Sequence, residues 1–131
     1  MLYGKGKNTR PNFVLWLIQK LSSKERVKIV TDQYNNPTLA DNLADAIKEA
    51  IEKNISGILN IAGSEYLSRY DFALKVAKKF NFDKNLISLA LTSELKQKAP
   101  RPHRGGLKID KAKKLLKTEL LDVEKGLEYI K

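Results

Sequence analysis

The sequence predicts a layered α/β domain, and two kinds of pattern support that prediction. Segments with the apolar spacing of a helix alternate with short apolar runs that are typical of β-strands. In chain order they give α-β-α-β-α-β-α-α, which favours helices packed on a sheet. The chain has 131 residues, the length of one ordinary domain, so we expect a single domain over residues 1–131.

The first predicted elements are a loop, a helix and a strand. Residues 1–10 are polar and contain glycine, which predicts a loop after the end of a short strand. The apolar run over 13–21 predicts a buried helix of about three turns. Val27 and Ile29 alternate with charged residues, which predicts a strand over 26–32.

The middle of the chain predicts a second helix and a second strand. The helix is expected to begin at Thr38, which has the spacing of a capping box with Asp41. The apolar residues expected on its inner face lie four apart: Leu39, Leu43, Ile47 and Ile51. The run 57–63 is apolar and bounded by glycines, so it predicts a strand buried on both faces. Such a strand would leave an apolar sheet edge that a partner has to cover.

The last third of the chain predicts a helix, a strand, a loop and two short helices. Ser68 is expected to cap the helix. The strand is predicted at 86–91 and the loop at 92–108. Asp110 and Asp122 are the expected caps of the final two helices.

The composition excludes several classes of site. There is no cysteine, which removes disulfides, thiolate catalysis and cysteine-ligated zinc and fits a reducing, cytoplasmic compartment. The one histidine, His103, has no G-x-S-x-G motif to accompany it, so we favour a surface loop residue over a catalytic one. No apolar run approaches the roughly 20 residues of a membrane span, so no membrane partner is expected.

The net charge of +10 has two interpretations. One is a phosphate-rich partner, and the other is a lysine-rich solvated surface, which the charge rules favour. The basic stretches lack the interleaved aromatic residues of a base-stacking surface, which disfavours nucleic acid.

Two segments could bind phosphate. The helix start at Asn12 and Phe13 offers backbone N–H groups to an anion, although an ordinary helix cap fits equally well. Arg101 and Arg104 lie in a loop with prolines and glycines, where guanidinium groups can bind phosphate or remain solvated. There is no P-loop. Gly4 and Gly6 are not followed by the strand–turn–helix pattern of a dinucleotide-binding motif.

These residues also carry a resemblance to a known family. The ordered set is Leu2-Tyr3-Gly4, Asn12-Phe13-Val14, Asp32-Gln33, Pro37-Thr38, Gly57-Ile58-Leu59-Asn60-Ile61-Ala62-Gly63 and Ala99-Pro100-Arg101-Pro102. Its order and spacing resemble the C-terminal half of dTDP-4-dehydrorhamnose reductases, which belong to the extended short-chain dehydrogenase/reductase superfamily. The resemblance implies the substrate-binding part of that fold without the N-terminal Rossmann half.

The resemblance implies that the catalytic machinery lies in the other half. Family members transfer hydride from NADPH to the 4-keto group of a dTDP-sugar, using a glycine-rich loop and a Tyr-x-x-x-Lys pair of the N-terminal half. We therefore expect no catalytic, cofactor-binding or metal-binding residue here, and no activity of this chain alone. Lys7 follows Tyr3 at the Tyr-x-x-x-Lys spacing, but Tyr3 belongs to the Leu2-Tyr3-Gly4 segment of the resemblance. Met1 stands where the family usually has a substrate-contacting tryptophan.

The resemblance also assigns substrate-binding roles. Asn12 and Phe13 would meet the diphosphate of the sugar nucleotide, and Arg101 would pair with it. Gln33 would lie near the nucleotide, with Arg104 as a helper. The expected partners are a nucleotide-diphosphate sugar and either a second copy of the chain or a separate N-terminal half. The alternative is a non-catalytic interaction or regulatory module that keeps the reductase shape, and a basic nucleic-acid binder ranks third.

Overall fold

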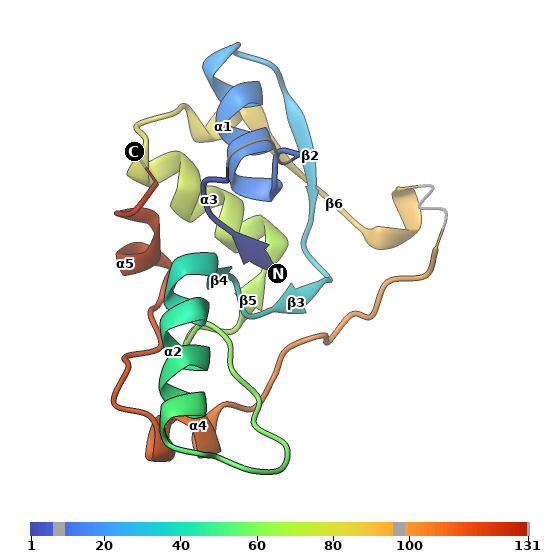
Figure 1. Cartoon of the computed structure of the whole chain (residues 1–131). Helices are drawn as coiled ribbons and strands as arrows, with labels where there is room; N and C mark the ends of the chain where they lie inside the picture. Colours follow the sequence, from blue (N-terminus) through green and yellow to red (C-terminus); the bar gives the residue numbers. More distant parts are fainter. Residues whose placement is uncertain (7–9, 96–98, 131) are drawn as a thin grey trace.

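The computed structural model describes residues 1–6, 10–95 and 99–130 (Figure 1). The five α-helices of these ranges are α1 (Phe13–Ser22), α2 (Ala40–Glu52), α3 (Arg69–Lys79), α4 (Asp110–Leu115) and α5 (Val123–Leu127). The strands are β1 (Leu2–Tyr3), β2 (Val27–Val30), β3 (Tyr34–Asn35), β4 (Thr38–Leu39), β5 (Leu67–Ser68) and β6 (Ile87–Ala90). Two short 3-10 helices, η1 (Lys84–Leu86) and η2 (Thr92–Glu94), flank β6. The predicted α/β class is confirmed.

The strands form three separate two-stranded ladders within the described ranges. The longest joins β2 and β6 in parallel, with Val27 opposite Ile87 and Val30 opposite Ala90. β1 pairs with β4 in parallel, and β3 pairs with β5 antiparallel. The short ladders leave much of the packing to helices.

A larger core lies between α1, α3, α5 and β2, in the upper part of Figure 1. Its buried residues are Tyr3, Val14, Leu17, Leu21, Val27, Ile29, Leu39, Leu67, Phe72, Ala73, Val76, Ala77, Ile87, Val123, Leu127 and Ile130. Tyr3 and Phe72 bring their ring centroids within 5.5 Å at its centre. This larger core fixes α3 against β2, and so determines where the ends of both elements lie.

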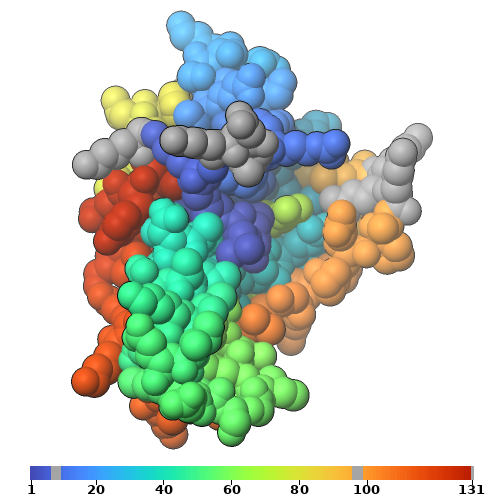
Figure 2. All heavy atoms as spheres, viewed as in Figure 1, coloured from blue at the N-terminus to red at the C-terminus, as the bar shows by residue number. Residues whose placement is uncertain are grey.

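A smaller core lies at the other end of the molecule, where α2 and α4 come together (Figure 1). Its buried residues are Ala46, Ala62, Ile109, Ala112, Leu116 and Leu120. Figure 2 shows α2 and the segment after it on the lower front of this end, with no other element over them on that face.

Several local predictions are confirmed. α1 covers the predicted range, and β2 and β6 lie within the predicted strands. Ser68 caps α3, since its hydroxyl oxygen accepts from the Asp71 N–H at 3.0 Å. Asp122 caps α5 by accepting from the Lys125 N–H at 2.8 Å.

The predicted cap of α2 is wrong. The helix begins after Leu39, and the Thr38 hydroxyl is used elsewhere. It donates to the Asn36 carbonyl and accepts from the Gly63 N–H, both at 3.0 Å, inside the fold. A buried hydroxyl with two backbone partners is well satisfied, so it does not cap the helix. Asp110, another predicted cap, is the first residue of α4 itself, preceded by Ile109 without a side-chain cap.

The predicted inner face of α2 is also partly wrong. Ile47 and Ile51 are 45% and 71% exposed, and the buried residue of the helix is Ala46. The helix packs through a small residue, which brings its backbone close to the rest of the smaller core.

The predicted strand at 57–63 is not a strand. Ile58 is 84% exposed, and side chains rather than a neighbouring strand bind the backbone of the segment. Thr38 binds the Gly63 N–H, Asn36 Nδ2 donates to the Gly63 carbonyl at 3.1 Å, and Lys111 Nζ donates to the Ile58 carbonyl at 2.8 Å. These side chains bind backbone groups near both ends of the segment, where a strand would have used a ladder.

Among the described helices, none combines the length and the apolar character that crossing a membrane would need.

Candidate functional site

An open pocket lies where β2 ends and the chain turns into β3. Its volume is about 300 Å³. Its lining comes from four distant parts of the sequence: Met1, Gln33, Tyr34, Asn35, Arg69, Arg101, Pro102 and Gly105. The pocket therefore brings together Gln33 and Arg101, two of the residues predicted to bind substrate.

The loop that carries Arg101 is fixed to β3 by backbone hydrogen bonds. The Tyr34 N–H donates to the His103 carbonyl at 2.7 Å, and the Gly105 N–H donates to the Tyr34 carbonyl at 2.9 Å. Arg104 forms an isolated bridge to Tyr34 through its backbone. These contacts place Arg101 at the pocket, whereas the exposed Arg104 is not among its described lining residues.

Gln33 is buried below the pocket with only 5% of its surface exposed. Its Nε2 donates to Thr92 Oγ1 at 2.9 Å, so η2 holds the amide in place. The neighbouring Asp32 accepts from the same Thr92 hydroxyl at 2.7 Å and from the Thr92 N–H. The hydroxyl bond is the main cause that lowers the pKa of Asp32, which therefore remains a carboxylate. This polar cluster orients Gln33.

His103 contacts the same cluster from the surface. Its Nδ1 lies 3.0 Å from the Asp32 carbonyl and 3.5 Å from the Asp32 carboxylate. The side chain is 65% exposed. These contacts fit an anchor for the loop.

Arg69, a residue that the sequence analysis did not select, also lines the pocket. It is half-buried as the first residue of α3. Its guanidinium carbon lies 5.5 Å from the centroid of the Phe13 ring, and its Nη1 lies 3.5 Å from Gln33 Oε1. Burial, and then repulsion by Arg101, lowers the pKa of Arg69. A cation in the first turn of a helix opposes the helix dipole, and that signal was available in the sequence.

Asn12 and Phe13 occupy the start of α1 as predicted, but Asn12 acts as an ordinary helix cap. Its Oδ1 accepts from the N–H groups of Val14 and Leu15, at 3.1 and 3.3 Å. Its Nδ2 donates to the Gly4 carbonyl at 2.6 Å. The ring of Phe13 stacks on Phe72 at 5.6 Å and lies beneath Arg69. An anion at this helix end would have to replace the Asn12 oxygen.

Tyr3 does not have the environment of a catalytic tyrosine. It is 2% exposed in the larger core, and burial raises the pKa of its phenol. A proton donor for hydride transfer needs contact with substrate and a pKa near the working pH. Lys7, which follows Tyr3 at the Tyr-x-x-x-Lys spacing, lies outside the described residues.

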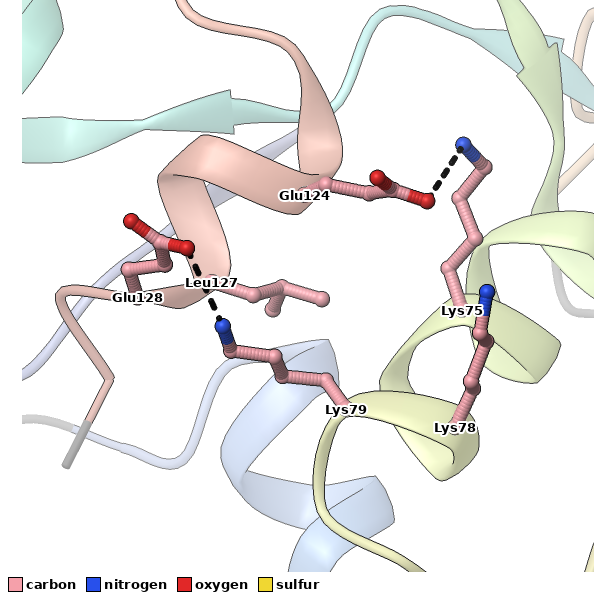
Figure 3. A pocket seen from close by; sticks show the side chains of 6 residues that line it. All are labelled: Lys75, Lys78, Lys79, Glu124, Leu127 and Glu128. Atoms are coloured by element: carbon pink, nitrogen blue, oxygen red, sulfur yellow. Dashed lines mark hydrogen bonds and ion pairs between the residues drawn. The ribbon is translucent and has the colours of Figure 1, made fainter.

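A second groove lies between α3 and α5 (Figure 3). It is lined by Lys75, Lys78, Lys79, Glu124, Leu127 and Glu128. Lys75 pairs with Glu65 at 2.7 Å and with Glu124 at 3.9 Å, and Lys79 pairs with Glu128 at 3.3 Å. Its carboxylates offset these lysines, so this groove is a weaker anion site than the arginine-lined pocket. Over the described residues, no group of three metal-binding acidic or histidine side chains occurs.

The fold and the pocket together define a class: an α/β lobe with a polar, arginine-lined recess and no dinucleotide-binding motif in its sequence. A family model, that of the RmlD substrate binding domain, matches residues 1–130. The chain belongs to this family.

Known relatives agree with that assignment. A dTDP-4-dehydrorhamnose reductase of Escherichia coli is 27% identical over 95% of this chain and 44% of its own length. A probable low-salt glycan biosynthesis reductase of Haloferax volcanii is 28% identical over 74% of this chain and 32% of its own length. A crystal structure of dTDP-4-dehydrorhamnose reductase from Bacillus anthracis in complex with NADP is 27% identical, with a TM-score of 0.85 over 97% of this chain and 44% of that one. The chain thus spans less than half the length of these relatives.

Proposed function

We propose that this chain is the substrate-binding portion of a dTDP-4-dehydrorhamnose reductase-like enzyme of nucleotide-sugar biosynthesis. The observation that carries the proposal is the pocket in which Gln33 and Arg101 meet although 67 residues separate them in the sequence. In this proposal Arg101 binds the diphosphate and the oriented Gln33 lies near the nucleotide. Phe13 supports the pocket from α1, while Asn12 and Arg104 have secondary roles.

NADPH belongs, in this proposal, to the portion of such an enzyme that this chain does not cover. A reductase has to position a nicotinamide against its substrate and supply a proton. In this proposal the residues described above bind and orient the substrate, and Tyr3, which is buried and does not line the pocket, is not the proton donor. We expect the purified chain not to oxidise NADPH with a nucleotide-4-keto sugar, and cofactor oxidation that follows the chain through further purification would contradict this.

The test of the pocket is calorimetric titration with dTDP. Arg101→Ala should weaken binding by roughly 1.5–3 kcal/mol, the usual scale of a hydrogen bond to a charged group. Arg101→Lys should recover only part, because a point charge does not replace the planar guanidinium. Asn12→Ala should cost less, because its side chain caps the helix rather than facing the pocket.

Two controls accompany this titration. Arg26→Ala removes the same charge from an exposed residue outside the pocket lining and should leave binding unchanged. Random duplex DNA at equal phosphate concentration tests the nucleic-acid alternative, because added salt weakens both interactions. Equal or tighter binding to DNA that Arg101→Ala does not affect would overturn the proposal.

A further inference from the structure

Two guanidinium groups line the same pocket without a carboxylate between them. Arg69 comes from the start of α3, and Arg101 comes from the loop that β3 anchors. Across the described residues, the ion pairs include neither arginine. The pocket therefore carries two positive charges that its described lining does not neutralise.

The surroundings of Arg69 hold its guanidinium without satisfying its charge. The ring of Phe13 lies on one side, Gln33 Oε1 accepts at 3.5 Å, and Met1 Sδ lies 3.6 Å from Nη2. All three contacts are with neutral groups. Removing a cation from water is costly unless an anion compensates it, so an arginine in this state favours an anionic ligand.

The position of Arg69 is also rigid. Its backbone N–H donates to the Gln33 carbonyl at 3.0 Å, which connects the first residue of α3 to the residue just before β3. Ser68, the residue before it, caps the helix and is buried. With its backbone held in this way and its guanidinium in contact with Phe13, Gln33 and Met1, Arg69 loses less conformational freedom on binding a ligand than a solvated arginine would.

We propose that Arg69 and Arg101 together bind one diphosphate group, each arginine contacting a different phosphate, as a two-arginine site across the pocket. The inference deepens the proposed function and rests on it, since it adds Arg69 to the residues that the resemblance implies for substrate binding. A diphosphate carries at least two negative charges, which removes the repulsion between the two cations. Planar guanidinium groups contact phosphate oxygens through two parallel N–H bonds.

The experiment titrates the full chain with inorganic pyrophosphate and with dTDP, using four variants. Arg69→Met and Arg101→Met keep much of the side-chain volume and remove the charge, and a double variant combines them. Arg26→Met is the matched control with the same loss of charge on the exposed surface. Circular dichroism and thermal unfolding confirm that each variant is folded, and Arg69→Lys replaces Arg69→Met if the latter is not.

The expected result is a Kd for pyrophosphate at least tenfold higher in each single variant and unchanged in Arg26→Met. Because both arginines bind the same group, their effects should not be independent. The fold-increase in Kd of the double variant should be much smaller than the product of the fold-increases in the two single variants. Arg69→Lys, where it takes the place of Arg69→Met, should still bind pyrophosphate more weakly than the wild type, because it keeps the charge but lacks the planar fork.

Three outcomes would overturn the inference, the proposed function or both. In the first outcome, the Arg69 variant binds pyrophosphate as tightly as the wild type, whereas Arg101→Met binds it more weakly. The two-arginine site is then wrong and the proposed function stands. If pyrophosphate binding needs both arginines but dTDP binds no more tightly than pyrophosphate, the two-arginine site stands and the nucleotide-sugar proposal fails. If the wild type binds neither ligand, both fail.

Discussion

The two hydrophobic cores of this molecule are built in different ways. The larger core buries aromatic rings and branched side chains around α3, including Phe72 and Leu17 at 0% exposure. In the smaller core, three of the six buried residues are alanine. Isoleucines near it remain at the surface, with Ile51 at 71% and Ile58 at 84% exposure. Because little apolar area is buried there, apolar burial alone stabilises that end weakly.

Polar contacts take over part of that role at the smaller core. Glu49 of α2 accepts from the N–H groups of Lys117 and Thr118 at 2.6 and 2.7 Å, and from the Thr118 hydroxyl at 2.6 Å. Asn42, two turns earlier, donates to the Glu119 carbonyl and accepts from the Leu121 N–H. One face of α2 thus holds the segment between α4 and α5. The comparison teaches that the pocket depends on the end stabilised by apolar burial, since its arginine-bearing helix α3 belongs to the larger core.

The largest expected effect is the loss of Phe72 in the larger core. Phe72→Ala removes a ring that contacts Tyr3 and Phe13, and should lower the free energy of unfolding by about 3–5 kcal/mol. Urea unfolding measures it. Tyr129→Ala, at a residue that is 61% exposed, is the control and should change stability by less than about 0.5 kcal/mol. A cost for Phe72→Ala close to that of the control would mean that the larger core is not the main source of stability.

A smaller effect is expected from Glu49→Gln, because it removes a charge and leaves the shape. The Glu49 side chain is 14% exposed, and the hydrogen bonds from Lys117, Lys53 and Thr118 hold the pKa of its carboxyl far below the ordinary value of 4.5. Glu49→Gln should therefore lower Tm at neutral pH. Glu52→Gln is the control, because Glu52 is 63% exposed and has only a 3.8 Å pair with Lys48.

The pH dependence of this effect has a defined sign. A carboxyl with a depressed folded-state pKa stabilises the fold fully above its ordinary pKa and loses that contribution as pH falls through the folded-state pKa. The Tm difference between wild type and Glu49→Gln should thus be constant above pH 4.5 and shrink at more acidic pH. A difference that grows on acidification, or one matched by Glu52→Gln, would refute the role of Glu49.

The elements that the sequence predicts correctly carry their signal locally. α3 has its cap at Ser68, and α5 has its cap at Asp122, each within three residues of the N–H group that it binds. Thr38 shows the opposite case. Its partner, the Gly63 N–H, is 25 residues away, so local spacing with Asp41 indicated a cap that the fold does not form.

Arg101 could be selected from its basic loop alone, but only the family resemblance could indicate Gln33 as a second residue of the same site. Gln33 and Arg101 share no local motif, and only tertiary structure brings them to one pocket. Arg69 stayed unselected because the resemblance assigned it no role. Its unusual position, a cation at the positive end of a helix, was visible in the sequence but needed the neighbouring Phe13 and Arg101 to acquire meaning.

The smallest effect is expected at Ile58, where the sequence and the structure disagree most. A strand buried on both faces would make Ile58→Asn strongly destabilising, whereas a residue that is 84% exposed should tolerate it within about 0.5 kcal/mol. Ala62→Asn, in the same segment but 5% exposed, is the matched contrast and should cost more, because it places an amide in the smaller core. Urea unfolding and sedimentation velocity are both measured. If Ile58→Asn lowers stability by more than about 1 kcal/mol, or dissociates a larger species, Ile58 is covered in solution by another chain. The smaller core would then be one side of an interface, and the apolar area that it buries would have to include the area covered by the other chain.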